Sequence, residues 1–284
     1  MNTGFPNKIA ISRTDSIGDV VVTLPLCGYI KTHFPETKIV FVGKEYTRAV
    51  IESCQYVDEF YNFDTREAQT LQVDAIVFAF PDKTAMKWAK SIHIPIRVAT
   101  ANRLHSWIYA NKRVFFSRKQ SPLHESQLNF FLLRFFDSNI KIPEIETLSN
   151  LQTLLPTHKS PISINPNKHS VIFHMLSKGS AKNWSMQKFE ELAEVLDPKK
   201  FDIYLTGTEN EGSIIRKTFP RLAHVHDITG KLSLHELIAF ISSCQLIVAA
   251  STGPLHIAAG TGVHAVGLYP CEKPMHAGRW APLG

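Results

Sequence analysis

The 284-residue sequence lacks long hydrophobic runs and has few cysteines. No stretch approaches the roughly 18 unbroken apolar residues of a membrane-spanning helix. The opening segment, MNTGFPNKIAIS, contains no signal-peptide hydrophobic region. The four cysteines lie far apart and form no C-x-x-C pair (Cys27, Cys54, Cys244 and Cys271). We therefore expect a reduced, cytoplasmic protein without a structural zinc site.

Several motifs with well-defined chemistry are also missing. The N-terminal half has neither a G-x-G-x-x-G turn nor a P-loop lysine, so this half need not bind a nucleotide. There is no D-x-D triplet to hold a divalent ion. The sequence therefore predicts no metal site.

Acidic residues are absent from the basic segment 97–119, in a chain of net charge +6. Its cations are Arg97, Arg103, Lys112, Arg113, Arg118 and Lys119, and they alternate with Trp107, Tyr109, Phe115 and Phe116. Such a segment suits nucleic acid, anionic lipid head groups or a phosphorylated substrate. A solvated basic face explains the same composition equally well.

Short β-rich runs alternate with helical patterns along most of the chain. The first half gives strands at 8–13, 37–43, 73–80 and 94–100, with a helix between the first two that reaches about His33. After a helix at 124–137 and a polar linker within 121–169, the alternation resumes. It gives strands at 170–177, 201–207, 224–227, 245–251 and 264–270 and helices at 186–196, after Glu209, 233–243 and 254–260. This order predicts α/β architecture with parallel sheets. We expect two Rossmann-like domains, 1–160 and 161–284, with ligands beyond the carboxyl ends of the strands.

The segment STGPLHIAAG, 251–260, follows an apolar strand and opens a helix. Thr252 suits the N-cap, Gly253 permits a tight turn and Pro254 fits the first helical turn. Free amides and the helix dipole at such a position attract anions, and His256 could add a donor. The pattern favours phosphate binding over an ordinary strand-to-helix turn.

Two further strand ends in the second half carry charged residues. The loop 177–185 holds Lys178 and Lys182, which suit a diphosphate, although surface lysines are common. Glu209 follows the strand 201–207, where carboxylates often bind ribose hydroxyls. A first-turn glutamate stabilised by the helix dipole is an equally good interpretation.

The first half offers SIGDVVVTLP, with Asp19 three residues after Ser16. This spacing is typical of a capping box, and local chemistry favours that interpretation. A carboxylate at the carboxyl end of a strand, facing a bound diphosphate, would alternatively serve as a general base.

Taken in order, these segments resemble the lipopolysaccharide heptosyltransferases of glycosyltransferase family 9. The matching motifs are R-x-D-S-I-G-D-V-V-V-T-L-P from Arg13, H-F-P-E at 33–36, Lys182-Asn183-Trp184, T-G-K-L-S-L at 229–234, S-T-G-P-L-H-I-A-A at 251–259 and the final R-W-A-P-L-G. The resemblance implies the GT-B fold, two Rossmann-like domains facing a cleft. It also implies an inverting, metal-independent transfer of heptose from ADP-heptose to the lipopolysaccharide inner core.

The resemblance also implies roles for individual residues. Asp19 matches the catalytic base, Lys182 the lysine on the donor phosphates and Glu209 the ribose-binding glutamate. The donor loop corresponds to Ser251, Thr252, Gly253 and His256. The family usually has aspartate where this chain has Ser251, which opens the alternatives of a different nucleotide sugar or of a non-catalytic nucleotide- or glycan-binding relative.

The implied acceptor is an anionic, lipid-linked glycan at the inner membrane face, which would place the protein peripherally on that membrane. Its expected contacts are Ser16, Arg97, Arg103, Lys112 and Arg113. No nucleic-acid partner and no cofactor beyond the nucleotide-sugar co-substrate are expected. The second domain is expected to be shortened, because relatives continue beyond the position of Gly284.

Overall fold

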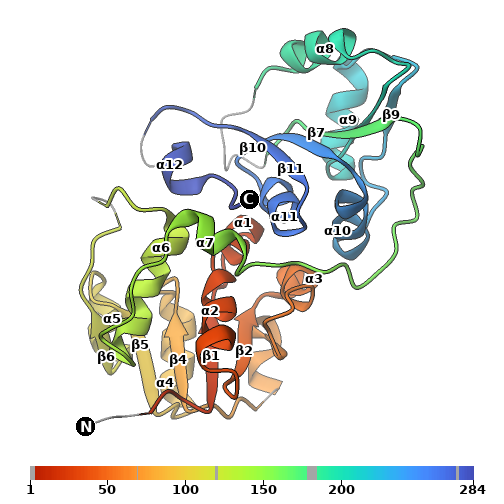
Figure 1. The fold of residues 1–284 in the computed structure, drawn as a ribbon. Coiled ribbons are helices and arrows are strands. Elements are labelled where there is room, and N and C mark those ends of the chain that lie inside the picture. The colour runs from red at the N-terminus through yellow and green to blue at the C-terminus, as the bar shows by residue number, and fades with distance from the viewer. Residues whose placement is uncertain (1–3, 69, 119–120, 178–183, 273–274) are drawn as a thin grey trace. The chain divides into compact units, whose positions relative to one another are not determined.

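The computed structural model describes residues 4–68, 70–118, 121–177, 184–272 and 275–284. The chain divides into two compact units, Met1–Thr153 and Leu154–Gly284, which are described separately here (Figure 1). The sequence pattern placed this boundary at residue 160.

The first unit is built on a six-stranded parallel sheet. Its strand order is β3-β2-β1-β4-β5-β6, and Ile9 of β1 lies opposite both Ile39 and Ala75. The strands are β1 (Lys8–Ser12), β2 (Lys38–Gly43), β3 (Glu59–Asn62), β4 (Ala75–Phe78), β5 (Ile96–Thr100) and β6 (Lys112–Val114). Strands β3 and β6, which the pattern did not predict, form the two edges.

Short helices connect these strands. They are α1 (Ile17–Val21), α2 (Pro25–His33), α3 (Arg48–Glu52), α4 (Lys83–Ser91), α5 (Leu104–Tyr109), α6 (Glu125–Phe130) and α7 (Ile145–Ser149), with 3₁₀ turns at Glu45–Thr47, Phe63–Ala68 and Phe131–Phe135. The single helix predicted to reach His33 is therefore two helices. Pro25 begins the second of them, where its missing N–H leaves no partner unsatisfied.

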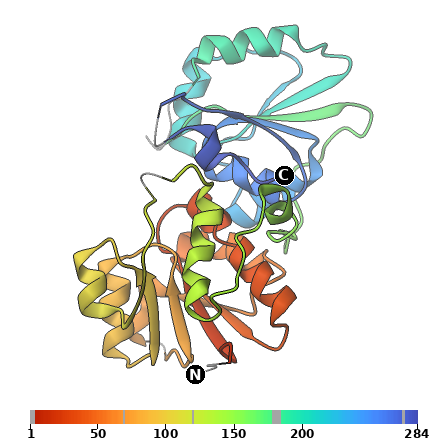
Figure 2. The same cartoon turned by 60° about the vertical axis from the view of Figure 1, so that its left-hand side comes forward.

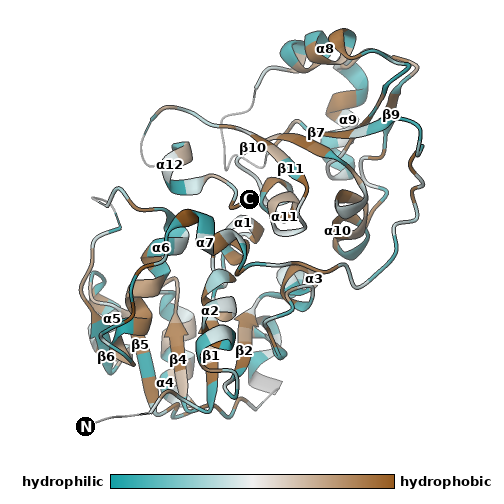
Figure 3. Ribbon diagram, in the orientation of Figure 1, coloured by the Kyte–Doolittle hydropathy of each residue, from teal (hydrophilic) through white to brown (hydrophobic). Residues whose placement is uncertain are grey.

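The first core has one apolar layer on each face of the sheet. On one face, Val42, Ile76 and Phe78 pack against Met86 and Trp88 of α4. Helices α2 and α6 contact each other, and both lie in front of the strands in Figure 1. The central strands β1 and β4 are hydrophobic over most of their length (Figure 3), as expected for parallel strands that are covered on both faces.

The second unit contains a five-stranded parallel sheet in the order β11-β10-β7-β8-β9. Its strands are β7 (His169–His174), β8 (Phe201–Leu205), β9 (Val225–Asp227), β10 (Leu246–Ala250) and β11 (His264–Leu268). Its helices are α8 (Met186–Val195), α9 (Glu209–Thr218), α10 (Leu234–Ser243), α11 (Gly253–Gly260) and α12 (Ala277–Trp280). Phe173, Phe189, Ile203 and Ile215 join β7, β8, α8 and α9 in one buried cluster, whereas α10 and α11 contact each other. The predicted α/β alternation of this half is confirmed element by element.

Candidate functional site

The candidate site residues lie at the carboxyl ends of the strands, where each sheet reverses its strand order. In the first unit the order reverses between β1 and β4, and in the second between β7 and β10. Helices on opposite faces diverge at such a point and leave a crevice that ligands commonly occupy. Arg13 to Asp19 follow β1, and Ser251 to Gly253 follow β10.

Asp19 lies in α1, and Ser16 caps that helix. The Ser16 hydroxyl accepts from the Asp19 amide at 3.4 Å and donates to Oδ2 of the Asp19 carboxylate. The helix cap predicted from the sequence is therefore confirmed. The carboxylate itself does not complete a capping box. It is shared between the Ser16 hydroxyl and Arg13, and its side chain is 20% exposed.

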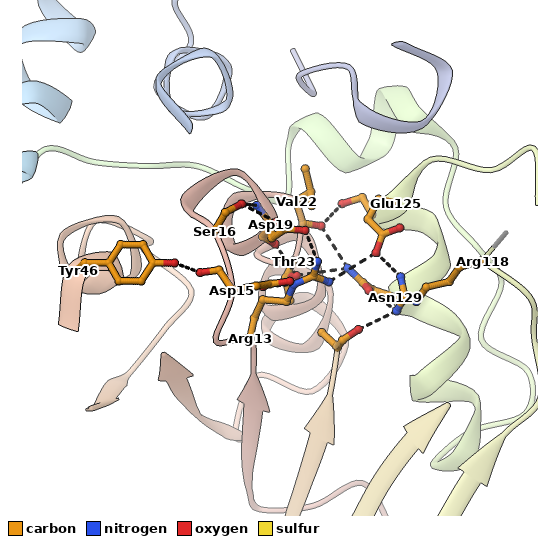
Figure 4. A network of polar contacts seen from close by, with 12 residues as sticks. Arg13, Asp15, Ser16, Asp19, Val22, Thr23, Tyr46, Arg118, Glu125 and Asn129 are labelled. Atoms are coloured by element: carbon orange, nitrogen blue, oxygen red, sulfur yellow. Dashed lines mark hydrogen bonds and ion pairs between the residues drawn. The ribbon is translucent and has the colours of Figure 1, made fainter. Parts of the chain in front are cut away.

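Arg13 is the centre of a buried charge network (Figure 4). Its Nε donates to Oδ1 of Asp15 at 2.6 Å, its Nη2 donates to Oδ1 of Asp19, and its Nη1 lies 3.5 Å from Oε1 of Glu125. Only 3% of the arginine side chain is exposed. Burial opposes its charge, but the three carboxylates together raise the pKa of the guanidinium above its ordinary value. Arg13 therefore remains a fixed cation that orients Asp19.

A second arginine closes the network from the other side. Arg118 donates to Oε1 of Glu125, to the Ala79 carbonyl at 2.7 Å and to Oδ1 of Asn129 at 3.0 Å. Three carboxylates thus share two guanidinium groups, which leaves one net negative charge. Glu125 is almost fully buried, whereas Asp15 and Asp19 are partly exposed to solvent.

Asp15 has a different environment from Asp19. The Tyr46 hydroxyl donates to its backbone carbonyl. Burial raises the pKa of the Asp15 carboxyl, Arg13 opposes this shift, and the neighbouring charge of Asp19 adds to it. Asp15 thus pairs with Arg13 in the network.

Helix α6 also holds the end of α1. The Val22 carbonyl accepts from the Ser126 hydroxyl and from the Asn129 side chain, and Asn129 also lies 3.4 Å from the Thr23 hydroxyl. These contacts satisfy the Val22 carbonyl at the buried C-terminus of α1, where the last carbonyls of a helix lack partners within the helix. They join α6 to the end of α1.

The second unit presents a helix N-terminus at the equivalent edge. Thr252 is the N-cap of α11, but its hydroxyl donates to the Ala250 carbonyl at 3.1 Å and does not accept from the helix amides. Gly253 and Pro254 occupy the first turn, and His256 is buried one turn later. The Thr252 side chain thus leaves the amides of Gly253 and Leu255 in the first turn uncapped, and Pro254 has no N–H. The anion site predicted from the sequence stays a prediction.

Ser251 is bound to the loop after the neighbouring strand. Its side chain hydrogen-bonds to Tyr269, and the Tyr269 hydroxyl donates to the Trp280 carbonyl at 2.6 Å. Burial raises the pKa of Tyr269 to about 12, although the bond with Ser251 opposes the shift. A neutral hydroxyl pair therefore links the ends of β10 and β11 to α12.

His174 ends β7 at the same switch point. Its Nδ1 lies 3.0 Å from the Thr206 hydroxyl. Burial lowers the pKa of His174 to about 4, with a small opposing effect of Glu211. The imidazole is therefore neutral at physiological pH, and the sequence pattern did not predict His174 as a site residue.

Glu209 is the first residue of α9, and Thr208 caps this helix in a capping box with Glu211. Glu209 pairs with Arg216, which also binds Asp227 at 2.9 Å and Thr229 at 3.0 Å. Gly230, at φ +74°, passes so close that a Cβ atom there would lie 2.4 Å from Oε2 of Glu209. The carboxylate is exposed and held in place by Arg216, so both interpretations of Glu209 remain open.

The basic segment does not form one surface. Arg97 lies near the amino end of β5 and donates to the carbonyls of Tyr109 at 2.9 Å and Ile94 at 2.5 Å, and burial lowers its pKa. Arg103 precedes α5 and Lys112 begins β6, both exposed, while Arg113 lies over the Trp107 ring at 4.6 Å. Arg118 belongs to the Arg13 network. Arg97 is thus remote from the strand ends that hold Ser16 and Asp19.

The structure brings Ser16 and Asp19 together in one unit, and Ser251, Thr252, Gly253 and His256 along one loop and helix of the other. Lys182 and Lys178 lie outside the described residues. Arg13, Glu125 and Asn129 were not predicted as site residues. Arg13 has a detectable signal, a cation directly after a buried strand, whereas Glu125 and Asn129 have none near Asp19 in the sequence.

Among the described residues, no group of three or more His, Cys, Asp or Glu side chains is arranged to hold a metal ion. In the same part of the chain, no helix has the length and apolar character needed to cross a bilayer.

Comparison with known proteins identifies relatives of this arrangement. Residues 93–284 match the model of glycosyltransferase family 9 (heptosyltransferase). A Haemophilus influenzae protein named as a candidate glycosyltransferase is 24% identical, over 97% of this chain and 86% of its own length.

Solved structures share the fold. A glycosyltransferase family 9 structure from Veillonella parvula has a TM-score of 0.77 at 18% identity, covering 99% of this chain and 85% of its own. The E. coli heptosyltransferase WaaC with ADP has a TM-score of 0.75 at 16% identity, covering 98% and 91%. E. coli ADP-heptose lps heptosyltransferase II has a TM-score of 0.76 at 17% identity, covering 95% of this chain and 87% of its own. The predicted GT-B type of fold, with two Rossmann-like parallel sheets, is confirmed.

Proposed function

Because the chain belongs to glycosyltransferase family 9, we propose that it transfers heptose from ADP-heptose to the inner core of lipopolysaccharide, with inversion and without a metal ion. In this proposal the first unit supplies the catalytic base and the second binds the nucleotide sugar. The observation that carries it is the position of Asp19, a partly exposed carboxylate fixed by Arg13 and Ser16 at the switch point of the first sheet.

Asp19 suits the role of base because its contacts leave room for a proton. Arg13 donates to Oδ1 and Ser16 to Oδ2, so these bonds use one lone pair of each oxygen, and each oxygen has a second. The two contacts hold the carboxylate in one orientation, and its side chain is 20% exposed, so an acceptor hydroxyl can reach it. An acceptor hydroxyl bound at Asp19 would lose its proton as it attacks the anomeric carbon.

The leaving diphosphate gains negative charge in the same step. The first-turn amides of α11 at Gly253 and Leu255 offer fixed positive dipoles without a metal ion, whereas Pro254 between them has no N–H. We assign Thr252, Gly253 and His256 to this donor site, with Glu209 at the ribose and Lys182 at the phosphates. For Lys182, only the sequence motif supports this assignment.

The choice of ADP-heptose follows the relatives. Two of the similar structures hold E. coli WaaC with ADP and with ADP-2-deoxy-2-fluoro heptose. Ser251 supports a second candidate, a family member that uses another nucleotide sugar, because the family usually has a carboxylate at this position. Here a hydroxyl bound to Tyr269 takes its place.

The proposed acceptor is an anionic lipid-linked glycan, reached by a cytoplasmic enzyme at the inner membrane face. Ser16 borders Asp19 and is the acceptor contact best supported by position. Arg103, Lys112 and Arg113 remain candidates on the basic segment, whereas Arg97 uses its guanidinium on backbone carbonyls.

Incubation of the protein with ADP-heptose and heptose-deficient lipopolysaccharide, followed by mass detection of the product, tests the proposal. We expect the mass of one heptose to be added, and the addition to persist in chelator. Calorimetric competition among nucleotide sugars separates the candidates. Tight binding of a different sugar nucleotide favours the Ser251 alternative, and binding of ADP-heptose without any product indicates a non-catalytic relative.

A further inference from the structure

Four large apolar side chains are exposed within a short stretch of the first unit. Leu104 is 82% exposed, Trp107 52%, Ile108 54% and Phe115 72%. The first three belong to α5, and Phe115 directly follows β6, the edge strand of the first sheet (Figure 1). We call these four residues the apolar surface.

The four side chains form a common surface. Leu104, Trp107 and Ile108 are spaced by three and four positions, so they share one face of α5. The rings of Trp107 and Phe115 meet edge to face, with centroids 6.1 Å apart. The indole N–H of Trp107 donates to the Ala101 carbonyl at 3.0 Å, so the ring needs no outside hydrogen-bond partner. Figure 2 shows α5 at the periphery of its unit, beside the sheet edge.

Cations border the apolar surface. Arg113 lies over the Trp107 ring, and Lys90 of α4 donates to the Ile108 carbonyl at 3.0 Å. Arg103 and Lys112 are exposed on either side of α5. Since segment 97–119 contains no Asp or Glu, no acidic residue of that segment offsets these charges.

We propose that the apolar surface docks on a bilayer that contains anionic lipid, with Leu104, Trp107, Ile108 and Phe115 in the interface and the bordering cations on the head groups. Interfacial helices combine aliphatic and aromatic residues on one face with basic residues beside it, and cations near an anionic leaflet strengthen binding. The inference deepens the proposed function and rests on it in one respect, since a lipid-linked acceptor lies at such a surface.

The composition favours a bilayer over the other occupants. Single-stranded nucleic acid stacks on aromatic rings, which leaves the exposed Leu104 and Ile108 unexplained. A second copy of the same surface would bring the cations of Arg103, Lys112 and Arg113 against one another. Lipid satisfies the aliphatic, aromatic and basic groups at once.

The test is flotation of the full chain with vesicles of phosphatidylcholine alone or with about one third phosphatidylglycerol. We expect binding to the anionic vesicles to be at least about tenfold tighter. Leu104→Glu is expected to weaken it about tenfold or more. Val195→Glu is the matched control, because Val195 is 80% exposed at the end of α8 in the second unit, and it should bind like the unaltered protein.

Transfer assays separate this inference from the proposed function. Leu104→Glu should transfer heptose to a lipid-free inner-core oligosaccharide at the normal rate and lose transfer only to acceptor embedded in vesicles. If the protein binds anionic vesicles but transfers no sugar, the docking surface is supported and the proposed function is wrong. Failure to bind either vesicle, unchanged binding by Leu104→Glu, a Leu104-dependent dimer, or equally tight binding to a DNA fragment would each overturn the docking surface.

Discussion

The two units place different chemistry at the carboxyl ends of similar parallel sheets. In the first unit, Arg13 is surrounded by charged side chains, and five ionic groups share one buried network. In the second unit, the corresponding edge carries the N-terminus of α11, a neutral His174 and the hydroxyl pair of Ser251 and Tyr269. The strand ends of the first unit carry ionic side chains. Those of the second carry helix amides and the uncharged side chains of His174, Ser251 and Tyr269.

This difference fits the two tasks that we propose for the units, proton removal by the first and donor binding by the second. A base must be ionised and held in one orientation, which opposite charges accomplish at short range. A binding site for a diphosphate gains from donors that carry no counter-charge of their own, because a neighbouring carboxylate would repel the ligand. The predictions below test this contrast, beginning with the largest expected effect.

Asp19→Asn removes the proposed base and retains the shape of the side chain. We expect kcat to fall by about 10²–10⁴-fold, while nucleotide binding to the second unit, measured by calorimetry, stays unchanged. Asp82→Asn is the control, since Asp82 caps α4 in the same unit by accepting from the Ala85 amide at 2.7 Å, and asparagine caps equally well. A variant of Asp19 that retains substantial turnover would remove this residue from its role.

Glu125→Gln tests whether the Arg13 network depends on the ion pairs of Glu125 with Arg13 and Arg118. The substitution leaves Arg13 and Arg118 with one partner fewer in a buried site, and breaking such a pair costs about 3–5 kcal/mol of stability. Urea unfolding measures the loss. Glu146→Gln, on the exposed side of α7, should change stability little. Equal stability of the two variants would mean that the network is not held by its ionic contacts.

Acid should lower the folding stability of the second unit through His174, at the carboxyl end of β7. Burial lowers its pKa from the ordinary 6.5 to about 4, so between these pH values the unfolded chain binds more protons than the folded one. Stability is therefore fully present above about pH 6.5 and is lost as the pH falls toward 4, by up to about 3 kcal/mol from this residue.

His174→Gln should flatten this part of the stability profile, measured by urea unfolding at a series of pH values. His264→Gln, at an exposed position of β11 in the same sheet, should leave the slope unchanged. A slope that persists without His174 assigns the effect to another group.

Tyr269→Phe gives the smallest expected effect. It removes the hydroxyl that joins Ser251 to the Trp280 carbonyl, and a buried hydrogen bond of this kind contributes about 1 kcal/mol. Tyr56→Phe removes a similar bond, to the Asn150 carbonyl at 3.1 Å, at an exposed position, and it should cost less. The difference between the two unfolding free energies is the quantity to measure.

The fold was largely predictable because parallel strands that are buried on both faces have nearly continuous apolar sequences. Strands β1, β2, β4 and β5 all have this character, and so do β7, β8 and β10. The strands β3 (EFYN) and β6 (KRV) escaped notice because each is short and carries charge at a sheet edge. The residues of β6 belong to the basic segment, and their charges gave no sign of a strand.

The candidate site was only partly predictable. Ser16 and Asp19 are three positions apart, and the cap between them follows from local spacing. The contacts of α6 with Arg13 and with the end of α1 do not, because tertiary contacts between distant segments leave no periodic trace in a single sequence. The same limit applies to Arg118, whose sequence neighbours suggested a surface, whereas its side chain reaches Glu125, Ala79 and Asn129.

The bond from Ser126 to the Val22 carbonyl spans 104 positions of the chain, and this separation has a consequence for protein synthesis. A ribosome adds about 5–20 residues per second, so α6 is made roughly 5–20 s after α1. During that interval the nascent chain already carries Asp19 but lacks Glu125, Ser126 and Asn129, which fix Arg13 and the end of α1. The nascent chain therefore gains the contacts that hold Arg13 and the end of α1 only after α6 has emerged and packed, although Asp19 is made early.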